Sequence, residues 1–398
     1  MEELLKFASR PTGAGEMFQL LRDGKPRTRA DLAAITGQAR STIAARLDLL
    51  VSAGLIAPAG EANSTGGRPP TTFAFRPEAK IVLAIDMRED HAHLAVTDLA
   101  SSILAETQEA MAVTDRPDTV LSGIAEAAKK LIATADRSLD DLASVGVGVP
   151  GPVENSTGRP INPPTMPSWH DIDVPRMLRD VLGAPVRVDN DVNLMALGEH
   201  RTIWPTVPDM LFVNVGSSIG SGIIADGELR RGAQGAAGDV GHVVVSNAGE
   251  ARCRCGNLGC LDAVASGNAL ASALRAHGLQ AADAGDVVAL VRSGDSIASQ
   301  KVRQAGREIG AVLAACVSIL NPSLIVVGGV VADAREHLIA GIREVVYQRS
   351  RPLATQHLRI VPSLNWAQVC VLGASVMAVD HVLSPIAIDS LIPSTALL

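Results

Sequence analysis

The sequence predicts an α/β protein made of a small winged helix-turn-helix unit over residues 1–78 and a larger two-lobed body over residues 79–398. Three observations carry this prediction. Short helical segments with capping and stop signals come before residue 60, whereas strands alternate with helices after Lys80. A strand–turn–strand pattern occurs twice in the body. Three closely spaced cysteines indicate a loop built around a structural metal ion.

Composition limits the classes of protein to which the chain can belong. A chain of 398 residues that is 47% hydrophobic can form two or three domains. No apolar run approaches the roughly 18 residues that cross a bilayer, and the acidic start MEELLKFASRPTGAGE lacks a secretory signal. We therefore expect a soluble cytoplasmic protein that does not enter a membrane.

The net charge of −7 is distributed unevenly. Residues 1–80 hold 11 Lys and Arg against 8 Asp and Glu, a local charge of +3, which leaves −10 for the remainder. A mildly basic unit on an acidic body is typical of a small DNA-binding module joined to a larger domain.

The first unit has the signals of three short helices. GEMFQLLRDG predicts a helix that ends at Gly24. In TRADLAAITG, Thr28 and Asp31 have the spacing of a capping box, and Gly37 marks the helix end. QARSTIAARLDLLVSAGLI predicts a third helix that ends at Gly54. Its apolar residues share one face: Ile43, Leu47 and Leu50. Two helices joined by a short turn with glycine form a helix-turn-helix, whose second helix enters the major groove of DNA.

The outward positions at and around this third helix carry polar or small side chains. Small or hydrogen-bonding residues are expected to point outward and to suit base edges and phosphates: Gln38, Arg40, Ser41, Thr42, Ala45 and Arg46. The following segment, APAGEANSTGGRPPTTFAF, predicts a wing whose tip, residues 66–69, carries Arg68 toward phosphates or the minor groove. Two alternatives stay open: a three-helix module that binds a protein, and an Arg68 that is merely solvated.

Two strand–turn–strand segments in the body predict two related lobes with a ligand cleft between them: KIVLAIDMREDHAHLAVTDL and DMLFVNVGSSIGSGIIADGEL. The second turn, residues 216–222, is rich in glycine and serine and could cradle phosphate, or it could be an ordinary hairpin. The first turn, residues 87–90, has no glycine and contains Glu89 and Asp90, so it disfavours a phosphate.

Cys253, Cys255 and Cys260 supply three thiolates within one loop, and His242 lies upstream. Three sulfurs and one imidazole complete a tetrahedral Zn²⁺ site with no open position, which is a structural arrangement. Each cysteine could instead be an unrelated buried residue, and His242 could be an ordinary hydrogen-bonded core histidine.

Polar residues on the predicted turns suit the hydroxyl groups of a sugar: Asn162, Asn190, Asp191, Asp239 and Asp262. Each aspartate alone could also be a helix cap or a surface group. For Asp191 we expect a ligand contact first, a helix cap second and a catalytic base third. Near the end of the chain, REIGAVLAACVSILNPSLIVVGGVV predicts a helix, an Asn-Pro stop, a buried strand and a Gly-Gly turn. That unit could hold an adenosine, or it could be an ordinary unit in which the helix packs on the strand.

From about residue 15 to about residue 380, these motifs resemble those of the ROK family (repressors, open reading frames and sugar kinases). GHVVV followed by CRCGNLGCLD resembles the family's zinc motif, and this implies the ligands His242, Cys253, Cys255 and Cys260. The resemblance also implies an actin-like, hexokinase-like two-lobed ATPase fold. The winged helix-turn-helix and the GGRP linker are typical of the repressor branch.

The resemblance further implies roles for single residues. VDNDVNLMALGE resembles the segment with the catalytic aspartate of the kinases, at Asp191. GDVGH resembles a sugar-contacting Glu-x-x-His element with Asp239 in place of glutamate, and GCLD has Asp262 where the kinases usually carry glutamate. The kinase turn of the type Asp-x-Gly-Gly-Thr is replaced by DMREDHA, in which Asp86 remains and the glycines do not. Because phosphoryl transfer depends on positioning and charge stabilisation, this replacement argues against catalysis.

The sequence therefore predicts a repressor of carbohydrate-metabolism genes with a structural Zn²⁺ and a non-catalytic sensor domain. Its partners are expected to be double-stranded operator DNA, a sugar or sugar-phosphate effector, and copies of itself in a homodimer or homotetramer. An active sugar kinase with an added DNA-binding head is the alternative. A third reading is a regulator that responds to a protein partner instead of a sugar.

Overall fold

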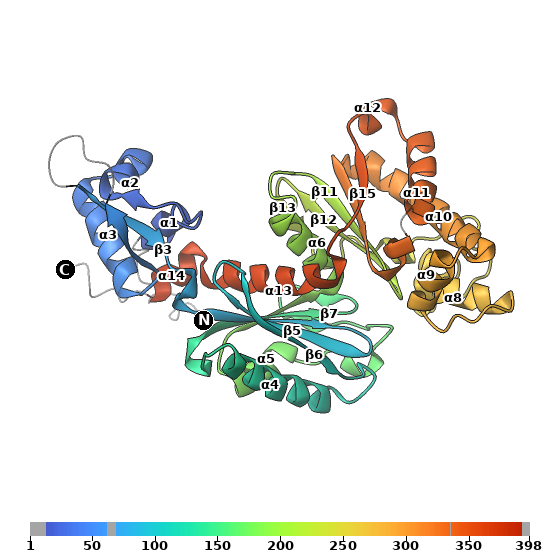
Figure 1. The fold of residues 1–398 in the computed structure, drawn as a ribbon, viewed down its shortest axis with the longest axis horizontal. Coiled ribbons are helices and arrows are strands. Elements are labelled where there is room, and N and C mark those ends of the chain that lie inside the picture. Colours follow the sequence, from blue (N-terminus) through green and yellow to red (C-terminus); the bar gives the residue numbers. More distant parts are fainter. Residues whose placement is uncertain (1–12, 62–68, 335, 392–398) are drawn as a thin grey trace.

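The computed structural model describes residues 13–61, 69–334 and 336–391, which form a head and a body of two lobes (Figure 1). We call residues 13–75 the head, residues 81–190 the first lobe and residues 210–362 the second lobe. Two helices connect the lobes, and the second of them continues toward the head. Each part has its own cluster of buried apolar side chains, and a fourth cluster lies around the connecting helices.

In its described residues the head consists of α1 (Ala14–Gln19), β1 (Arg27–Thr28), α2 (Arg29–Thr36), α3 (Arg40–Ser52), β2 (Ile56–Glu61) and β3 (Thr71–Phe75), with the sheet order β1-β3-β2. The predicted capping box is confirmed. The Thr28 hydroxyl accepts a hydrogen bond from the Asp31 N–H at 3.1 Å, and the Asp31 carboxylate accepts one from the Thr28 N–H at 2.8 Å. Ile43, Leu47 and Leu50 are fully buried, as their spacing predicted. The first helix is shorter than expected because hydrogen bonds of the i→i+3 type replace the α pattern after Gln19.

The two lobes are built on sheets of the same topology. The first sheet contains β4 (Ile81–Met87), β5 (His91–Asp98), β6 (Ile103–Ala110), β7 (Leu142–Val149) and β10 (Val186–Asn190), in the order β10-β7-β4-β5-β6. The second contains β11 (Met210–Val215), β12 (Ile219–Ala225), β13 (Glu228–Arg230), β14 (Leu324–Gly328) and β15 (Arg359–Pro362), in the order β13-β12-β11-β14-β15. In each sheet the first three strands form an antiparallel meander, and the last two are parallel to the first. This confirms the internal repeat.

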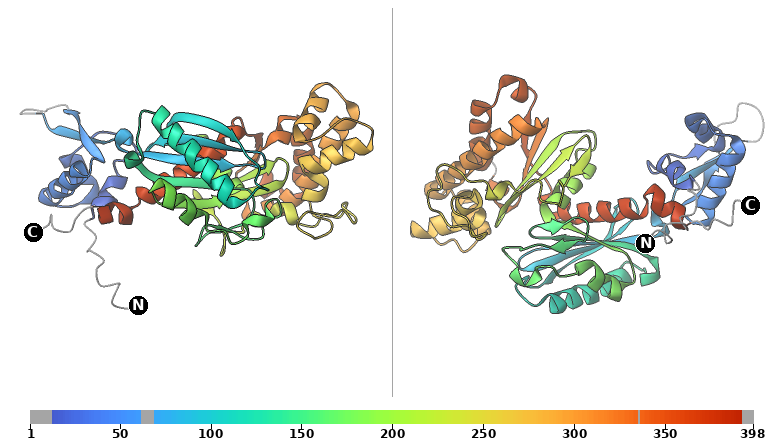
Figure 2. Two further views of the ribbon diagram at one scale, coloured as in Figure 1. Left: turned by 90° about the horizontal axis from the view of Figure 1, so that it is seen from below. Right: turned by 180° about the vertical axis from the view of Figure 1, so that it is seen from behind.

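Helices cover the outer faces of both sheets (Figure 2). The first lobe carries α4 (Pro117–Thr134), α5 (Val174–Leu182) and a short hairpin of β8 (Val153–Glu154) and β9 (Arg159–Pro160). The second lobe carries α7 (Asp262–Ala265), α8 (Gly267–Ala276), α9 (Ala284–Arg292), α10 (Ser296–Leu320), α11 (Glu336–Arg349) and α12 (Pro352–Thr355). The predicted Asn-Pro stop is confirmed, because α10 ends at Leu320, Asn321 caps it with a φ of 47°, and β14 begins at Leu324.

Two helices cross between the lobes. α6 (Asp191–Thr202) follows the last strand of the first sheet but packs against β11 and β12 of the second. α13 (Trp366–Val382) follows the last strand of the second sheet and packs against β4 and β7 of the first (Figure 1). The helices touch at glycines: a Cβ atom on Gly198 would lie 1.9 Å from the Val369 carbonyl oxygen, and one on Gly373 1.9 Å from that of Leu194. Only glycine permits this approach.

The end of the chain packs on the head. α14 (Pro385–Leu391) lies against α1, and the Asp389 carboxylate accepts hydrogen bonds from the N–H groups of Gly13 and Gly15. α14 lies within residues 79–398, the range predicted for the body, but it packs on the head. Its apolar Ile388 is buried in the core of the head, and α1 has no side-chain cap from its own sequence.

Among the described residues, no single helix is long and apolar enough to span a membrane. α13 and α14 meet that criterion only when they are taken together across a bend of 55°.

Candidate functional site

A cavity of about 660 Å³ lies between the lobes. Its walls come from the β4–β5 turn, the start of α6, the β11–β12 turn, residues 235–242 and the start of α13. Both strand–turn–strand segments therefore contribute their turns to one cavity, as the repeat predicted. A volume of this size is in the range of small-molecule sites.

Asn190 caps the helix that carries Asp191 into the cavity. The Asn190 carbonyl side-chain oxygen accepts hydrogen bonds from the N–H groups of Val192 at 3.0 Å and Asn193 at 3.1 Å. Its amide donates to the Gly151 carbonyl at 2.9 Å and to Asp191 Oδ1 at 3.0 Å. The cap role that we weighed for Asp191 thus belongs to Asn190, because Asn190 has the extended backbone of an N-cap and Asp191 is already helical.

Asp191 is a half-buried acid beside a second acid, Asp86. Burial, followed by the negative charge of Asp86, raises the pKa of Asp191 to about 7. Near neutral pH this carboxyl group can therefore donate a hydrogen bond to a ligand or accept one. The same pKa would suit a general base that removes a proton from a hydroxyl group.

Arg88 links the β4–β5 turn to the start of α13. Its Nε donates to Asp86 Oδ2 at 2.8 Å, and its Nη2 donates to the Ala367 carbonyl at 3.0 Å. The guanidinium also lies 5.7 Å from the centre of the Trp366 ring. These contacts fill the turn with side chains at the place where glycines would leave the backbone open to an anion.

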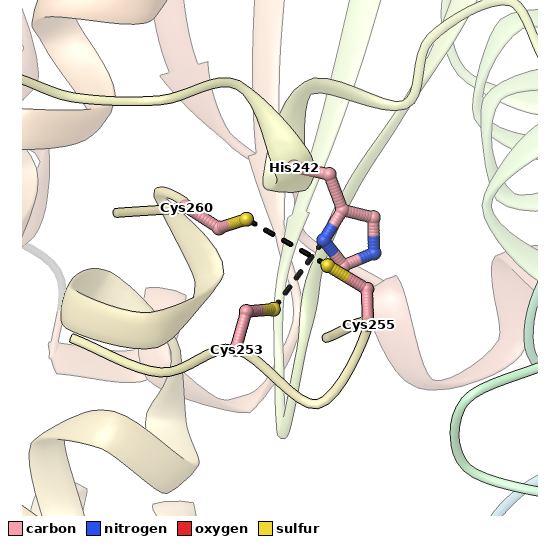
Figure 3. A group of neighbouring side chains, drawn as sticks. All are labelled: His242, Cys253, Cys255 and Cys260. Carbon is pink, nitrogen blue, oxygen red and sulfur yellow. Dashed lines mark hydrogen bonds between the residues drawn. The ribbon is translucent and has the colours of Figure 1, made fainter. Parts of the chain in front are cut away.

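The predicted metal ligands lie together (Figure 3). Cys253 Sγ is 3.5 Å from His242 Nδ1, Cys255 Sγ is 3.7 Å from Cys260 Sγ, and all four atoms lie within 4.8 Å of one another. A tetrahedral zinc ion with Zn–S bonds of about 2.3 Å and a Zn–N bond of about 2.0 Å holds its ligand atoms roughly 3.5–3.8 Å apart. The donor set and its spacing therefore fit a closed metal site.

The loop around these cysteines is shaped for such an ion. Gly256 and Gly259 have φ values of 94° and 77°, which confirms that the turn needs glycine. Burial, followed by the neighbouring Cys253 and Cys255 thiols, raises the pKa of the Cys260 thiol to about 12, and a bound cation would stabilise its thiolate.

The other predicted ligand contacts have different outcomes. Three of them line the cavity: Asp239, His242 and Asp262. Asp262 Oδ1 also accepts a hydrogen bond at 2.8 Å from the Ile219 N–H, so Asp262 helps to hold the β11–β12 turn in place. Asn162 does not line the cavity. It is exposed beyond the β8–β9 hairpin, and its backbone N–H donates to His170 Nδ1 at 3.2 Å. Nothing in the local sequence indicated that Asn162 would lie outside the cavity lining.

Asp189 and Arg231 form a contact that the sequence did not predict. Asp189 is buried, and its carboxylate accepts hydrogen bonds from Arg231 Nε at 2.5 Å and from Asn193 Nδ2 at 3.0 Å. This ion pair joins Arg231 to the end of β10, directly before α6. An acid at the end of a buried strand was the available signal, but its basic partner lies 42 residues away.

The predicted DNA contacts of the head divide into three groups. Arg40, Ser41 and Thr42 are exposed at the start of α3. Gln38 and Arg46, which we expected to point outward, are half-buried, and the Arg46 guanidinium donates a hydrogen bond to Gln38 Oε1 and packs against Gly13. Arg68 and the tip of the wing lie outside the described residues.

Comparisons with known proteins agree with this architecture. The sequence profile of the ROK family matches residues 82–381. The xylose repressor of Caldicellulosiruptor bescii is 26% identical over 382 residues, which cover 92% of this chain and 95% of the repressor. The glucokinase of Halalkalibacterium halodurans is 32% identical over 245 residues, which cover 56% of this chain and 72% of the glucokinase. A solved ROK family transcriptional regulator, a homolog of the E. coli MLC protein, superposes with a TM-score of 0.82 at 24% identity, covering 96% of this chain and 98% of that one.

Proposed function

The chain belongs to the ROK family, whose profile matches residues 82–381, and from this we infer that it is a sugar-responsive transcriptional repressor of carbohydrate-metabolism genes. One observation carries the inference. The alignment with the C. bescii xylose repressor spans 92% of the chain, a share too large to leave out the head. A protein that joins such a head to a sugar-kinase-like body has the parts of a regulator that senses a small molecule.

The head is proposed to be a winged helix-turn-helix over residues 1–78, completed by α14. In this reading α2 and α3 form the helix-turn-helix, and the β2–β3 hairpin forms the wing. Arg40, Ser41 and Thr42 would contact operator DNA from the exposed start of α3, and Arg68 would contact it from the wing. Gln38 and Arg46, which are hydrogen-bonded to each other, would contact the DNA beside the start of α3. A homodimer or homotetramer would present paired recognition helices to the two halves of a palindromic operator.

The body, residues 79–398 apart from α14, is proposed to be the sensor and oligomerisation domain. Asn190, Asp191, Asp239, His242 and Asp262 would meet the hydroxyl groups of the effector. A structural Zn²⁺ held by the three cysteines and His242 would keep the cavity wall in place, because His242 is both a proposed ligand and a lining residue, and the lining residue Asp262 follows Cys260 closely in the chain. The effector can change DNA affinity only to the extent that it prefers one arrangement of the lobes.

We further propose that this sensor does not transfer phosphate. The turn at residues 87–90 has no glycine, and Arg88 is bound to Asp86 and to the Ala367 carbonyl. A nucleotide tail would meet these side chains instead of open backbone N–H groups.

Selection of genomic DNA fragments by the purified protein tests the regulatory function. We expect enrichment of palindromic sites beside sugar-uptake or sugar-metabolism genes, and release of those fragments by one sugar of a panel in a gel-shift assay. Absence of any sequence-selective enrichment would remove the proposal. Enrichment without release by any sugar would favour a protein partner as the signal.

An active sugar kinase is the second candidate, and one observation favours it. The raised pKa of Asp191 suits a base that deprotonates a hydroxyl group. ATP turnover with a panel of hexoses decides the question. Turnover that is lost in Asp191→Asn would establish the kinase, whereas no turnover above background supports the sensor.

A further inference from the structure

A carboxylate joins the two turns that face each other across the cavity. Glu89 lies on the β4–β5 turn of the first lobe. Its Oε1 accepts a hydrogen bond at 3.2 Å from the Ser217 hydroxyl on the β11–β12 turn of the second lobe. Glu89 Oε1 also lies 3.7 Å from Arg254 Nη1 of the cysteine loop. One acidic group of the first lobe is therefore held by a hydroxyl and a guanidinium of the second.

A serine hydroxyl and an arginine are donors that bind phosphate oxygens in many proteins. Here both donors already hold the Glu89 carboxylate. An incoming phosphoryl group would have to displace Glu89 and then remain beside it. Two anions at such a short distance repel each other.

The remaining charges of the cavity act in the same direction. Among the lining residues the arginines are Arg88 and Arg254, and each already faces an acid, Asp86 and Glu89 respectively. Further acidic side chains line the cavity: Asp90, Asp239 and Asp283. A zinc ion with three thiolates and a neutral imidazole would carry a net charge of about −1 and would not reverse the sign.

We propose that Glu89 is a built-in anion that closes the phosphate-binding side of the cavity, so that the effector is an uncharged sugar and not a sugar phosphate or a nucleotide. This inference rests on the proposed sensing function and deepens it by naming the class of ligand. Uncharged hydroxyl groups are well served by the same cavity, because each can donate to a carboxylate at no cost in charge repulsion.

Titration calorimetry on the full-length protein tests the inference with matched ligands: xylose, glucose, N-acetylglucosamine, the 6-phosphates of the two hexoses, and ADP with Mg²⁺. We expect an uncharged sugar to bind, and the sugar phosphates and ADP to bind at least about tenfold more weakly. Because the Glu89 side chain is 40% exposed, raising the salt concentration should reduce this ratio.

Glu89→Gln removes the charge and keeps a similar shape. It should reduce the preference for uncharged ligands at least about threefold. Glu126→Gln is the matched control, since it removes the same charge from the exposed surface of α4 and should leave the ratio unchanged.

The outcomes separate the inference from the function on which it rests. A sugar phosphate or ADP that binds the wild type as tightly as the uncharged sugar overturns the inference and leaves a sugar-responsive regulator. An unchanged ratio in Glu89→Gln overturns the role of Glu89. Binding of no sugar of either kind removes the sensing function and the inference together.

Discussion

The Asp389 carboxylate in α14 accepts a hydrogen bond from the Gly15 N–H in α1 at 3.0 Å, so the end of the body holds the first helix of the head. α14 follows α13, and α13 begins at Trp366, which lines the cavity. Two consecutive helices thus run from the cavity wall to the head (Figure 2). A second link is the ion pair between Arg22 of the head and Asp380 of α13, at 2.7 Å.

Asp389→Ala should loosen the head. The carboxylate caps α1 from a distant part of the chain, and loss of such a cap costs about 1 kcal/mol. We expect faster proteolysis within residues 13–61 and weaker DNA binding. Ser390→Ala is the control, because the Ser390 hydroxyl donates its hydrogen bond within α14, to the Ala387 carbonyl. Equal proteolysis of the two variants would show that this contact does not hold the head.

Cys255→Ser should empty the metal site. Zinc content measured by mass spectrometry on the purified chain should fall from about one equivalent to near zero, since tetrahedral sites need all four ligands. The thermal midpoint should fall as well, because metal binding contributes to folding. Cys316→Ser on α10 is the matched control and should retain the metal. Unchanged metal content in Cys255→Ser would disprove the site.

The pKa of Asp191 predicts a specific dependence of stability on pH. The folded-state pKa of about 7 lies above the ordinary value of 3.8, so the folded protein binds the proton more tightly than the unfolded chain. The contribution of Asp191 is therefore most favourable below about pH 4 and is lost as the pH rises toward 7.

Asp191→Asn removes this titration. The free energy of unfolding of the variant should match that of the wild type near pH 4 and exceed it at pH 8, by up to about 4 kcal/mol. Denaturant unfolding at several pH values measures the difference, and Asp180→Asn on the surface of α5 serves as the control. A difference between variant and wild type that does not change with pH would refute the shifted pKa.

Arg40→Ala should weaken DNA binding. An exposed arginine at the start of α3 is placed to neutralise a phosphate, so its loss should lower affinity about tenfold at low salt and reduce the salt dependence by about one ion. Arg179→Ala removes the same charge from α5 in the body and should have no effect on affinity. Equal affinities of the two variants would exclude this face of α3 from the interface.

Much of the fold could be predicted from local patterns. The Thr28–Asp31 capping box, the buried face of α3 and the two strand–turn–strand segments each depend on residues in one continuous stretch of chain. The metal ligands were also predictable, because three of the four lie within eight residues. In each case the physical cause acts over a short stretch of chain, where spacing alone defines which side chains meet.

The rest depends on contacts between distant segments. The amino-acid sequence by itself determined the elements, the repeat and the donor atoms of the metal site. Only the tertiary structure decided that α14 docks on the head, that Asn162 lies outside the cavity lining, that Arg46 packs against Gly13, and that Glu89 meets Ser217 across 128 residues. Such contacts arise when whole helices and sheets pack, and the free energy of that packing is shared among many side chains. No single stretch of sequence encodes it.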